Sequence, residues 1–208
     1  MKKKEKALFV IEALKKRYPE AKCSLTYKKP YELLIATRLS AQCTDARVNI
    51  VTKELFQKFT SLEDFANADI ADIEESVRSC GLYKTKAADI KKMSRQLLDN
   101  FGGELPETIE ELTTLSGIGR KTANLIVGDI YGKPSIVTDT HCIRITNRLG
   151  LTKEKEPFKV EKDLAKILPP KESGAFCHRL VHFGREVCTA RSPKCELCEL
   201  KEVCSFKK

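Results

Sequence analysis

The residues best suited to chemistry in this 208-residue chain are four cysteines near its C-terminal end. They follow the pattern Cys188-x6-Cys195-x2-Cys198-x5-Cys204. Four thiolates that converge bind either an iron-sulfur cluster or a structural zinc ion, because both take soft sulfur ligands. Structural zinc commonly takes two Cys-x2-Cys pairs, whereas this chain has one such pair and two longer arms. The spacing therefore favours an iron-sulfur cluster and leaves zinc as the alternative.

A second candidate for chemistry is Lys121, which follows a glycine-containing turn in the segment 115–124, LSGIGRKTAN. Gly117 and Gly119 permit a tight turn and a close approach of a ligand to the backbone. The N–H groups at the start of the next helix can bind a phosphate. Arg120 and Lys121 lie at the positive end of that helix dipole, where a cation is unfavourable unless a phosphate or a reaction requires it. The alternative is an ordinary turn between two helices.

Asp139 lies between a short extended stretch, 134–137, and a helix expected from residue 142. A single Asp before a helix usually serves as its N-cap. Alternatively, Asp139 and Lys121 face one cleft, where the lysine is a nucleophile and the carboxylate handles charge and protons. The residues themselves leave both interpretations open.

Helices must position these groups, because most segments have helical periodicity and strand signals are nearly absent. Apolar residues recur at spacings of three and four in 7–14 and again in 48–59. Three helices are expected in the C-terminal third, and before them the expected ranges are 4–17, 31–39, 44–59, 61–68, 70–79, 84–100, 108–115 and 121–130. The sequence therefore predicts an all-α fold.

Charge and cysteine content narrow the functional class. The chain has 38 Lys and Arg against 29 Asp and Glu, a net charge of +9, which indicates a polyanionic partner such as nucleic acid. Nine cysteines, an odd number, without a secretion signal favour a metal or cluster over a disulfide framework. No segment has the length of a membrane span, so a cytoplasmic, nucleoid-associated location is expected. The other cysteines are expected to be small buried residues, namely Cys23, Cys43, Cys80, Cys142 and Cys177.

Together, the hairpin with Lys121, the Asp139 that follows it, and the x6-x2-x5 cysteine spacing resemble the endonuclease III family. The segments 39–45, LSAQCTD, and 81–87, GLYKTKA, are also similar to family segments, so the resemblance is close to full length. Cys43 departs from the pattern, in which a small Ala-like residue is expected.

The resemblance implies a bifunctional DNA glycosylase and AP lyase of base-excision repair that excises oxidised pyrimidines. Lys121 would be the nucleophile that forms a Schiff base and cuts the strand by β-elimination, and Asp139 would be the catalytic carboxylate. The implied fold has two helical domains with a DNA cleft between them. One domain is 23–133, and the other joins 1–22 to 134–208 and carries a 4Fe-4S cluster on the four clustered cysteines. The implied partner is double-stranded DNA with damaged bases or abasic sites, and the protein would be a monomer.

The resemblance also implies DNA-binding residues. Gln42 and Leu82 would enter the duplex and fill the space left by an extruded base. Without the resemblance, they would be interpreted as a surface glutamine and a core leucine. Further contacts with DNA are expected from Gly117, Gly119, Arg120, Arg191 and Lys194. The last two are otherwise solvated side chains.

Two other functional classes compete with a repair enzyme. A non-catalytic DNA-binding protein would use the hairpin for phosphate but would not need both Lys121 and Asp139. RNA processing is less favoured, because the sequence has no run of stacking aromatic residues of the kind that single-strand binders use.

Overall fold

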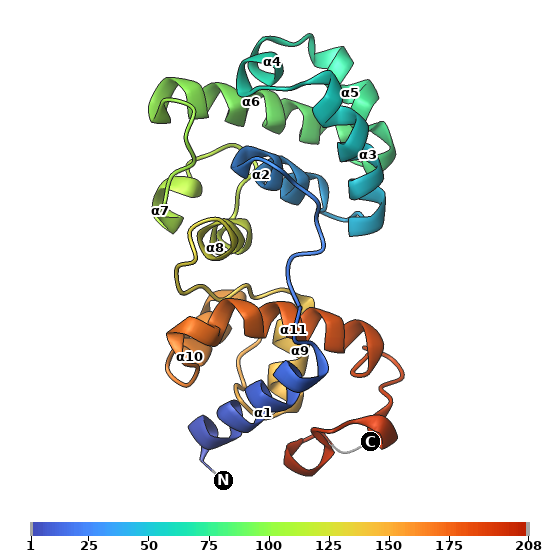
Figure 1. Ribbon diagram of the computed structural model, residues 1–208, viewed down its shortest axis with the longest axis vertical. Helices are drawn as coiled ribbons and strands as arrows, with labels where there is room; N and C mark the ends of the chain where they lie inside the picture. The colour runs from blue at the N-terminus through green and yellow to red at the C-terminus, as the bar shows by residue number, and fades with distance from the viewer. Residues whose placement is uncertain (1, 207–208) are drawn as a thin grey trace. The chain divides into compact units, whose positions relative to one another are not determined.

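A computed structural model describes residues 2–206, and every regular element in that range is a helix (Figure 1). The predicted all-α fold is confirmed. The α-helices are α1 (Lys3–Arg17), α2 (Pro30–Leu39), α3 (Asp45–Lys58), α4 (Leu62–Asn67), α5 (Ile70–Val77), α6 (Tyr83–Phe101), α7 (Ile109–Leu112), α8 (Arg120–Asp129), α9 (Thr140–Arg148), α10 (Pro157–Ala165) and α11 (Ser173–Glu186). No helix among the described residues is long and apolar enough to cross a membrane.

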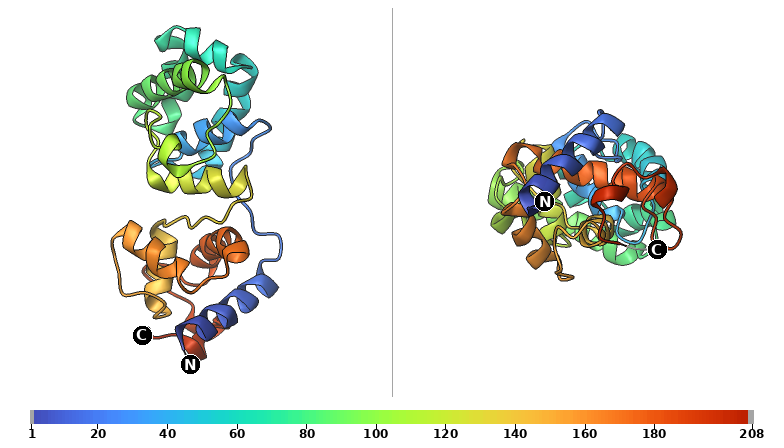
Figure 2. Two further views of the ribbon diagram at one scale, coloured as in Figure 1. Left: turned by 90° about the vertical axis from the view of Figure 1, so that its left-hand side faces the viewer. Right: turned by 90° about the horizontal axis from the view of Figure 1, so that it is seen from below.

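The helices form two compact units. Unit 1 consists of Met1–Cys23 and Gly132–Lys208, so it combines α1 with α9, α10 and α11. Unit 2 is Ser24–Tyr131 and contains α2 to α8. Figure 2 shows the same units from two further directions, with segments from both parts of the chain side by side in unit 1.

The core of unit 1 is built from apolar stripes at helical spacing. In α1 the buried residues are Ala7, Val10, Ile11 and Leu14. They belong to the same hydrophobic cluster as Ile145 of α9 and Phe176, Leu180 and Phe183 of α11. Full burial of such a side chain contributes roughly 1.5–3 kcal/mol. The N-terminal helix is therefore held by apolar contacts with segments more than a hundred residues later in the chain.

Unit 2 is organised around α6, whose 19 residues make it the longest helix among the described residues. Its buried face, which includes Ile90, Met93 and Leu97, packs mainly against α4 and α5. The helix ends at Gly102, which has a left-handed φ of 61°, and Gly103 N donates to Leu97 O. This arrangement satisfies a terminal carbonyl and stops the helix.

Two predicted helices end at least two residues earlier than expected. In place of 108–115, α7 covers only Ile109–Leu112, because the chain turns where the Thr113 and Thr114 hydroxyls donate to backbone carbonyls of the preceding turn. In place of 70–79, α5 ends at Val77 and a 3-10 helix, η1 (Arg78–Cys80), follows. Each α-helix therefore ends where other hydrogen bonds replace the α-helical pattern, from threonine hydroxyls after α7 and from a 3-10 turn after α5.

The prediction that the other five cysteines are buried is correct for three of them. Cys80, Cys142 and Cys177 are buried, whereas Cys23 and Cys43 are only half-buried because they lie in connecting segments. Burial and the nearby Cys43 thiol raise the pKa of Cys80, and the nearby Cys177 thiol and burial raise the pKa of Cys142. Four of these five cysteines therefore lie close together in two pairs.

Candidate active site

The glycine hairpin in unit 2 is anchored to two other helices by an ion pair. Asp89 of α6 accepts from Arg38 Nε at 2.8 Å and from Ser116 Oγ at 2.8 Å. Gly117, with φ +74°, packs directly on this pair, since an added Cβ would lie 2.6 Å from Arg38 Nε and 2.7 Å from Asp89 Oδ2. Glycine is therefore required at 117 by its backbone conformation and by the protein's own packing.

Gly119 differs from Gly117, because neither its backbone conformation nor the packing around it requires a glycine. It is the N-cap of α8 with φ −98°, and an added Cβ would meet no atom within 4 Å. Glycine has no side chain to cap the helix, so the N–H groups of the first turn of α8 are available to an external acceptor. An N-terminus of this kind suits a phosphate oxygen.

Lys121 lies in this first turn. It is the second residue of α8 and its side chain is exposed, whereas Arg120, the first residue, is half-buried. Buried residues of α8 hold the helix in unit 2, among them Ala123 and Ile126. The arrangement presents an exposed amine directly beside a surface that can bind phosphate.

Asp139 lies in unit 1, where it is the N-cap of α9. Its Oδ1 accepts from Cys142 N at 2.7 Å, so the capping interpretation is correct. Capping does not exclude chemistry, because the side chain is only half-buried and keeps a second carboxylate oxygen. Burial lowers the pKa of the neighbouring His141, Asp139 raises it, and Arg144 lowers it. The Asp139 charge therefore acts on the groups around it.

Gln42 and Leu82 share a backbone feature that no other non-glycine residue in the described part of the chain has. Their φ angles are +55° and +48°, in the left-handed region. Both side chains are exposed, Leu82 by 57%. The alternative in which Leu82 is a core residue is therefore wrong, and its exposure follows from the turn made by Gly81 and Leu82 before α6. Strained residues of this kind concentrate at functional sites.

Lys86 is a residue that the sequence reasoning missed. It is fully buried in α6, and its Nζ donates to Leu39 O and Cys80 O, both at 2.8 Å. A signal was available in the sequence, because Lys86 precedes Ile90 by four residues and Met93 by seven, and so lies on the apolar stripe of the helix.

The four clustered cysteines lie in a loop attached to α9. Arg148 of α9 donates to Cys188 Sγ at 3.3 Å and to Thr189 O at 2.8 Å, and the Cys204 thiol lies 3.3 Å from Arg148 O. Burial raises the pKa of the Cys198 thiol, and the nearby Cys188 and Cys204 raise it further. At least three of the sulfur atoms therefore influence one another.

The donor set fits an iron-sulfur cluster, because all four side chains are cysteine thiols and cysteine thiolates are the ligands that hold such clusters. When bound, such a cluster cross-links the loop.

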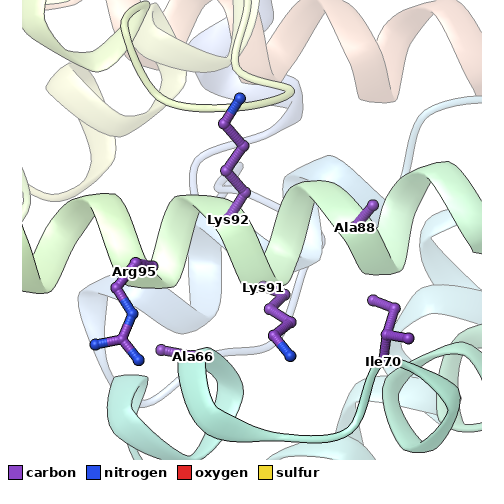
Figure 3. A pocket seen from close by; sticks show the side chains of 6 residues that line it. All are labelled: Ala66, Ile70, Ala88, Lys91, Lys92 and Arg95. Atoms are coloured by element: carbon purple, nitrogen blue, oxygen red, sulfur yellow. The ribbon is translucent and has the colours of Figure 1, made fainter.

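The remaining predicted contacts are on the surface. Arg191 and Lys194 in the cysteine loop are exposed. A separate surface pocket of about 380 Å³ is lined by Lys91, Arg95 and neighbouring residues of α4 to α6 (Figure 3). None of the predicted site residues lines this pocket, so we do not include it in the candidate site.

Comparison with known proteins places this geometry in a family. Residues 35–170 match the model described as HhH-GPD superfamily base excision DNA repair protein, and residues 188–204 match the iron-sulfur binding domain of endonuclease III. Endonuclease III of Synechocystis sp. is 44% identical over 97% of this chain and 93% of that protein. A non-covalent endonuclease III–DNA complex and a trapped endonuclease III–DNA covalent intermediate are each 42% identical with a TM-score of 0.93. They cover 99% of this chain, and 96% and 97% of their own.

A helical fold with a glycine hairpin and a C-terminal four-cysteine loop thus defines the class, a base-excision DNA-repair protein of the HhH-GPD superfamily. Within this class, the chain belongs to the endonuclease III family. The resemblance seen in the sequence is confirmed. The expected cofactor is confirmed as well, since the matched iron-sulfur domain begins at the first of the four cysteines and ends at the last.

Proposed function

We propose that this protein binds double-stranded DNA, excises oxidised pyrimidines and cuts the strand at the resulting abasic site with Lys121 as the nucleophile. Its membership of the endonuclease III family makes it a DNA glycosylase and AP lyase of base-excision repair. The observation that carries the residue assignment is the exposed Lys121 amine in the uncapped first turn of α8. It is supported by the full-length likeness to the trapped covalent complex.

In this mechanism the lone pair of Lys121 Nζ attacks C1′ of the damaged nucleotide and the glycosidic bond breaks, so the base leaves with the bonding electrons. The base takes up the proton that the attacking amine loses. The C1′–O4′ bond then breaks as O4′ takes a proton from water, which opens the sugar ring and leaves an iminium between Nζ and C1′. This iminium makes the 2′ hydrogen acidic. Loss of that proton and cleavage of the 3′ C–O bond then release the phosphate by β-elimination. Asp139 stabilises positive charge on the sugar, as the carboxylate of a glycosidase does.

The DNA contacts proposed for unit 2 are supported by the exposure and backbone conformation of Gln42, Leu82 and the hairpin glycines. Gln42 and Leu82 enter the duplex when the damaged base is extruded. The backbone of Gly117 and Gly119 accepts a close approach by a phosphate, and Arg120 adds positive charge. In unit 1, Arg191 and Lys194 contact the DNA backbone.

The cofactor and the wider setting complete the proposal. The 4Fe-4S cluster is ligated by Cys188, Cys195, Cys198 and Cys204. The boundaries proposed for the two domains are 23–133 and, for the other, 1–22 with 134–208. We propose that the protein works as a monomer on damaged bases or abasic sites in nucleoid DNA of the cytoplasm.

Borohydride trapping tests the central step. With an abasic duplex, EDTA and borohydride, the protein should form a covalent adduct that peptide mapping places at Lys121. Lys121→Ala should abolish both the adduct and strand cleavage. It should keep duplex binding within about threefold, because the backbone N–H groups of the hairpin remain.

Lys53→Ala serves as the matched control, since Lys53 is an exposed lysine of α3 outside the proposed site. This variant should form the adduct like the unmodified protein. If Lys121→Ala still forms the adduct, another amine is the nucleophile and the assignment is wrong. If the unmodified protein binds the duplex without cutting it, the protein is a non-catalytic DNA-binding module.

A further inference from the structure

Lys86 carries an unusual energetic cost for a side chain outside the proposed chemistry. Its side chain is fully buried, and transfer of an ammonium group from water into a protein interior is unfavourable unless it is well compensated. Burial lowers the pKa of Lys86, and the thiols of Cys43 and Cys80 oppose that shift. A buried amine at this place therefore needs a structural or functional reason.

Its two hydrogen bonds join the ends of two helices. Leu39 is the last residue of α2 and Cys80 is the last residue of η1, so both accepting carbonyls lie at negative helix ends. The two acceptors are 41 positions apart in the chain, from 80 − 39. One ammonium group thus satisfies two orphan carbonyls and ties two distant segments together.

The two segments lead directly to the strained residues. Gln42 follows Leu39 by three positions, and Leu82 follows Cys80 by two. A left-handed conformation costs a non-glycine residue about 1–2 kcal/mol. Neither side chain recovers that cost by burial, since both are exposed. Such a conformation persists only where the surrounding structure holds it.

We propose that Lys86 is a positioning residue for base extrusion, which holds the loops of Gln42 and Leu82 in a fixed relation so that both side chains enter the duplex together. This inference rests on the proposed function. The contact between the Cys43 and Cys80 thiols is a second link between the same loops. Lys86 touches neither DNA nor the reacting atoms and acts through the two loop backbones.

The test compares Lys86→Met with Lys91→Met, a matched control on the same helix. Lys91 Nζ also donates to a backbone carbonyl, that of Ala68 at 2.7 Å, but this carbonyl precedes α5 and belongs to neither loop. Figure 3 shows Lys91 on the side of α6 that faces Ala66 and Ile70. Each variant is assayed on a duplex with a paired oxidised pyrimidine and on the same duplex with an abasic site.

Lys86→Met should slow excision of the paired lesion about tenfold or more and leave cleavage at the abasic site within about threefold, because an abasic site has no base to extrude. Lys91→Met should leave the ratio of the two rates unchanged. The fluorescence of a 2-aminopurine base placed beside the lesion rises when the neighbouring base is extruded. This rise should be slower with Lys86→Met than with the unmodified protein. A general loss of stability would not produce this split between substrates.

Lys86→Gln keeps the test valid if the Met variant does not fold, because its amide can still donate to one carbonyl. It should change the ratio in the same direction by a smaller factor. Equal losses on both substrates, or an unchanged ratio in a folded Lys86→Gln, would overturn the inference. Failure of the unmodified protein to cut either duplex would instead refute the proposed function.

Discussion

Asp139 has two tasks that a single substitution can separate. As N-cap of α9 it accepts from Cys142 N, and as a carboxylate it supplies the negative charge proposed for catalysis. Asp139→Asn keeps a capping oxygen, so the free energy of unfolding should fall by less than about 1 kcal/mol. The loss of charge should lower the single-turnover rate at least ~100-fold. Thermal unfolding and a burst assay measure the two effects. A large loss of stability with normal turnover would leave Asp139 only as a cap.

Leu82 is a side chain whose exposure in the free protein gives it little role in stability. Leu82→Ala should therefore change the free energy of unfolding by less than about 0.5 kcal/mol. It should slow excision of a paired lesion more than cleavage at an abasic site, since only the first requires filling of the space left by a base. Gln42→Ala should show the same difference. Equal slowing on both substrates would contradict a role in the duplex.

The hairpin before α8 contains two glycines with different structural reasons. Gly117→Ala places a Cβ against Arg38 and Asp89 and at a positive φ, so it should destabilise unit 2 by about 1–3 kcal/mol. Gly119→Ala meets open space and should cost about 1 kcal/mol or less through the weaker cap. It should nevertheless weaken duplex binding, because its methyl group lies beside the N–H groups proposed for phosphate. Chemical denaturation and fluorescence anisotropy distinguish these effects. Unchanged affinity of Gly119→Ala would remove Gly119 from the DNA contacts.

The helices were predictable from the sequence because the buried face of a helix has apolar residues spaced three and four positions apart. The buried residues of α1 between Ala7 and Leu14 have this spacing. Helix ends were less predictable. The termination of α7 at Leu112 depends on threonine hydroxyls that can equally remain in a longer helix. Lys86 and Asp89 were missed for a different reason. Their partners, Leu39 and Arg38, are distant in the chain, and charged residues on a helix are usually solvated.

The chain as a whole carries a charge that suits its proposed partner. The formal net charge is +9, and four thiolates around a 2+ cluster core subtract two, so the loaded protein carries about +7. Each phosphate contact releases condensed counterions, which makes the affinity for duplex DNA depend on salt. Electrostatic attraction to any duplex is therefore expected, whether or not it contains a lesion.

Duplex affinity should fall steeply with salt concentration. About four phosphate contacts would give a slope near −4 in a plot of log affinity against log salt concentration. Arg120→Ala and Lys194→Ala should each reduce the magnitude of the slope by about one and weaken binding to undamaged and damaged duplexes alike, because phosphate contacts carry no base information. Lys53→Ala removes the same charge outside the proposed contacts, so it should leave the slope within about 0.3 of the original value. Fluorescence anisotropy titrations at about 50 to 300 mM salt measure this slope for the unmodified protein and the three variants. A flat dependence for the unmodified protein would contradict the proposed phosphate contacts. Equal changes for Lys53→Ala and Arg120→Ala would show that net charge, and not the hairpin, governs binding.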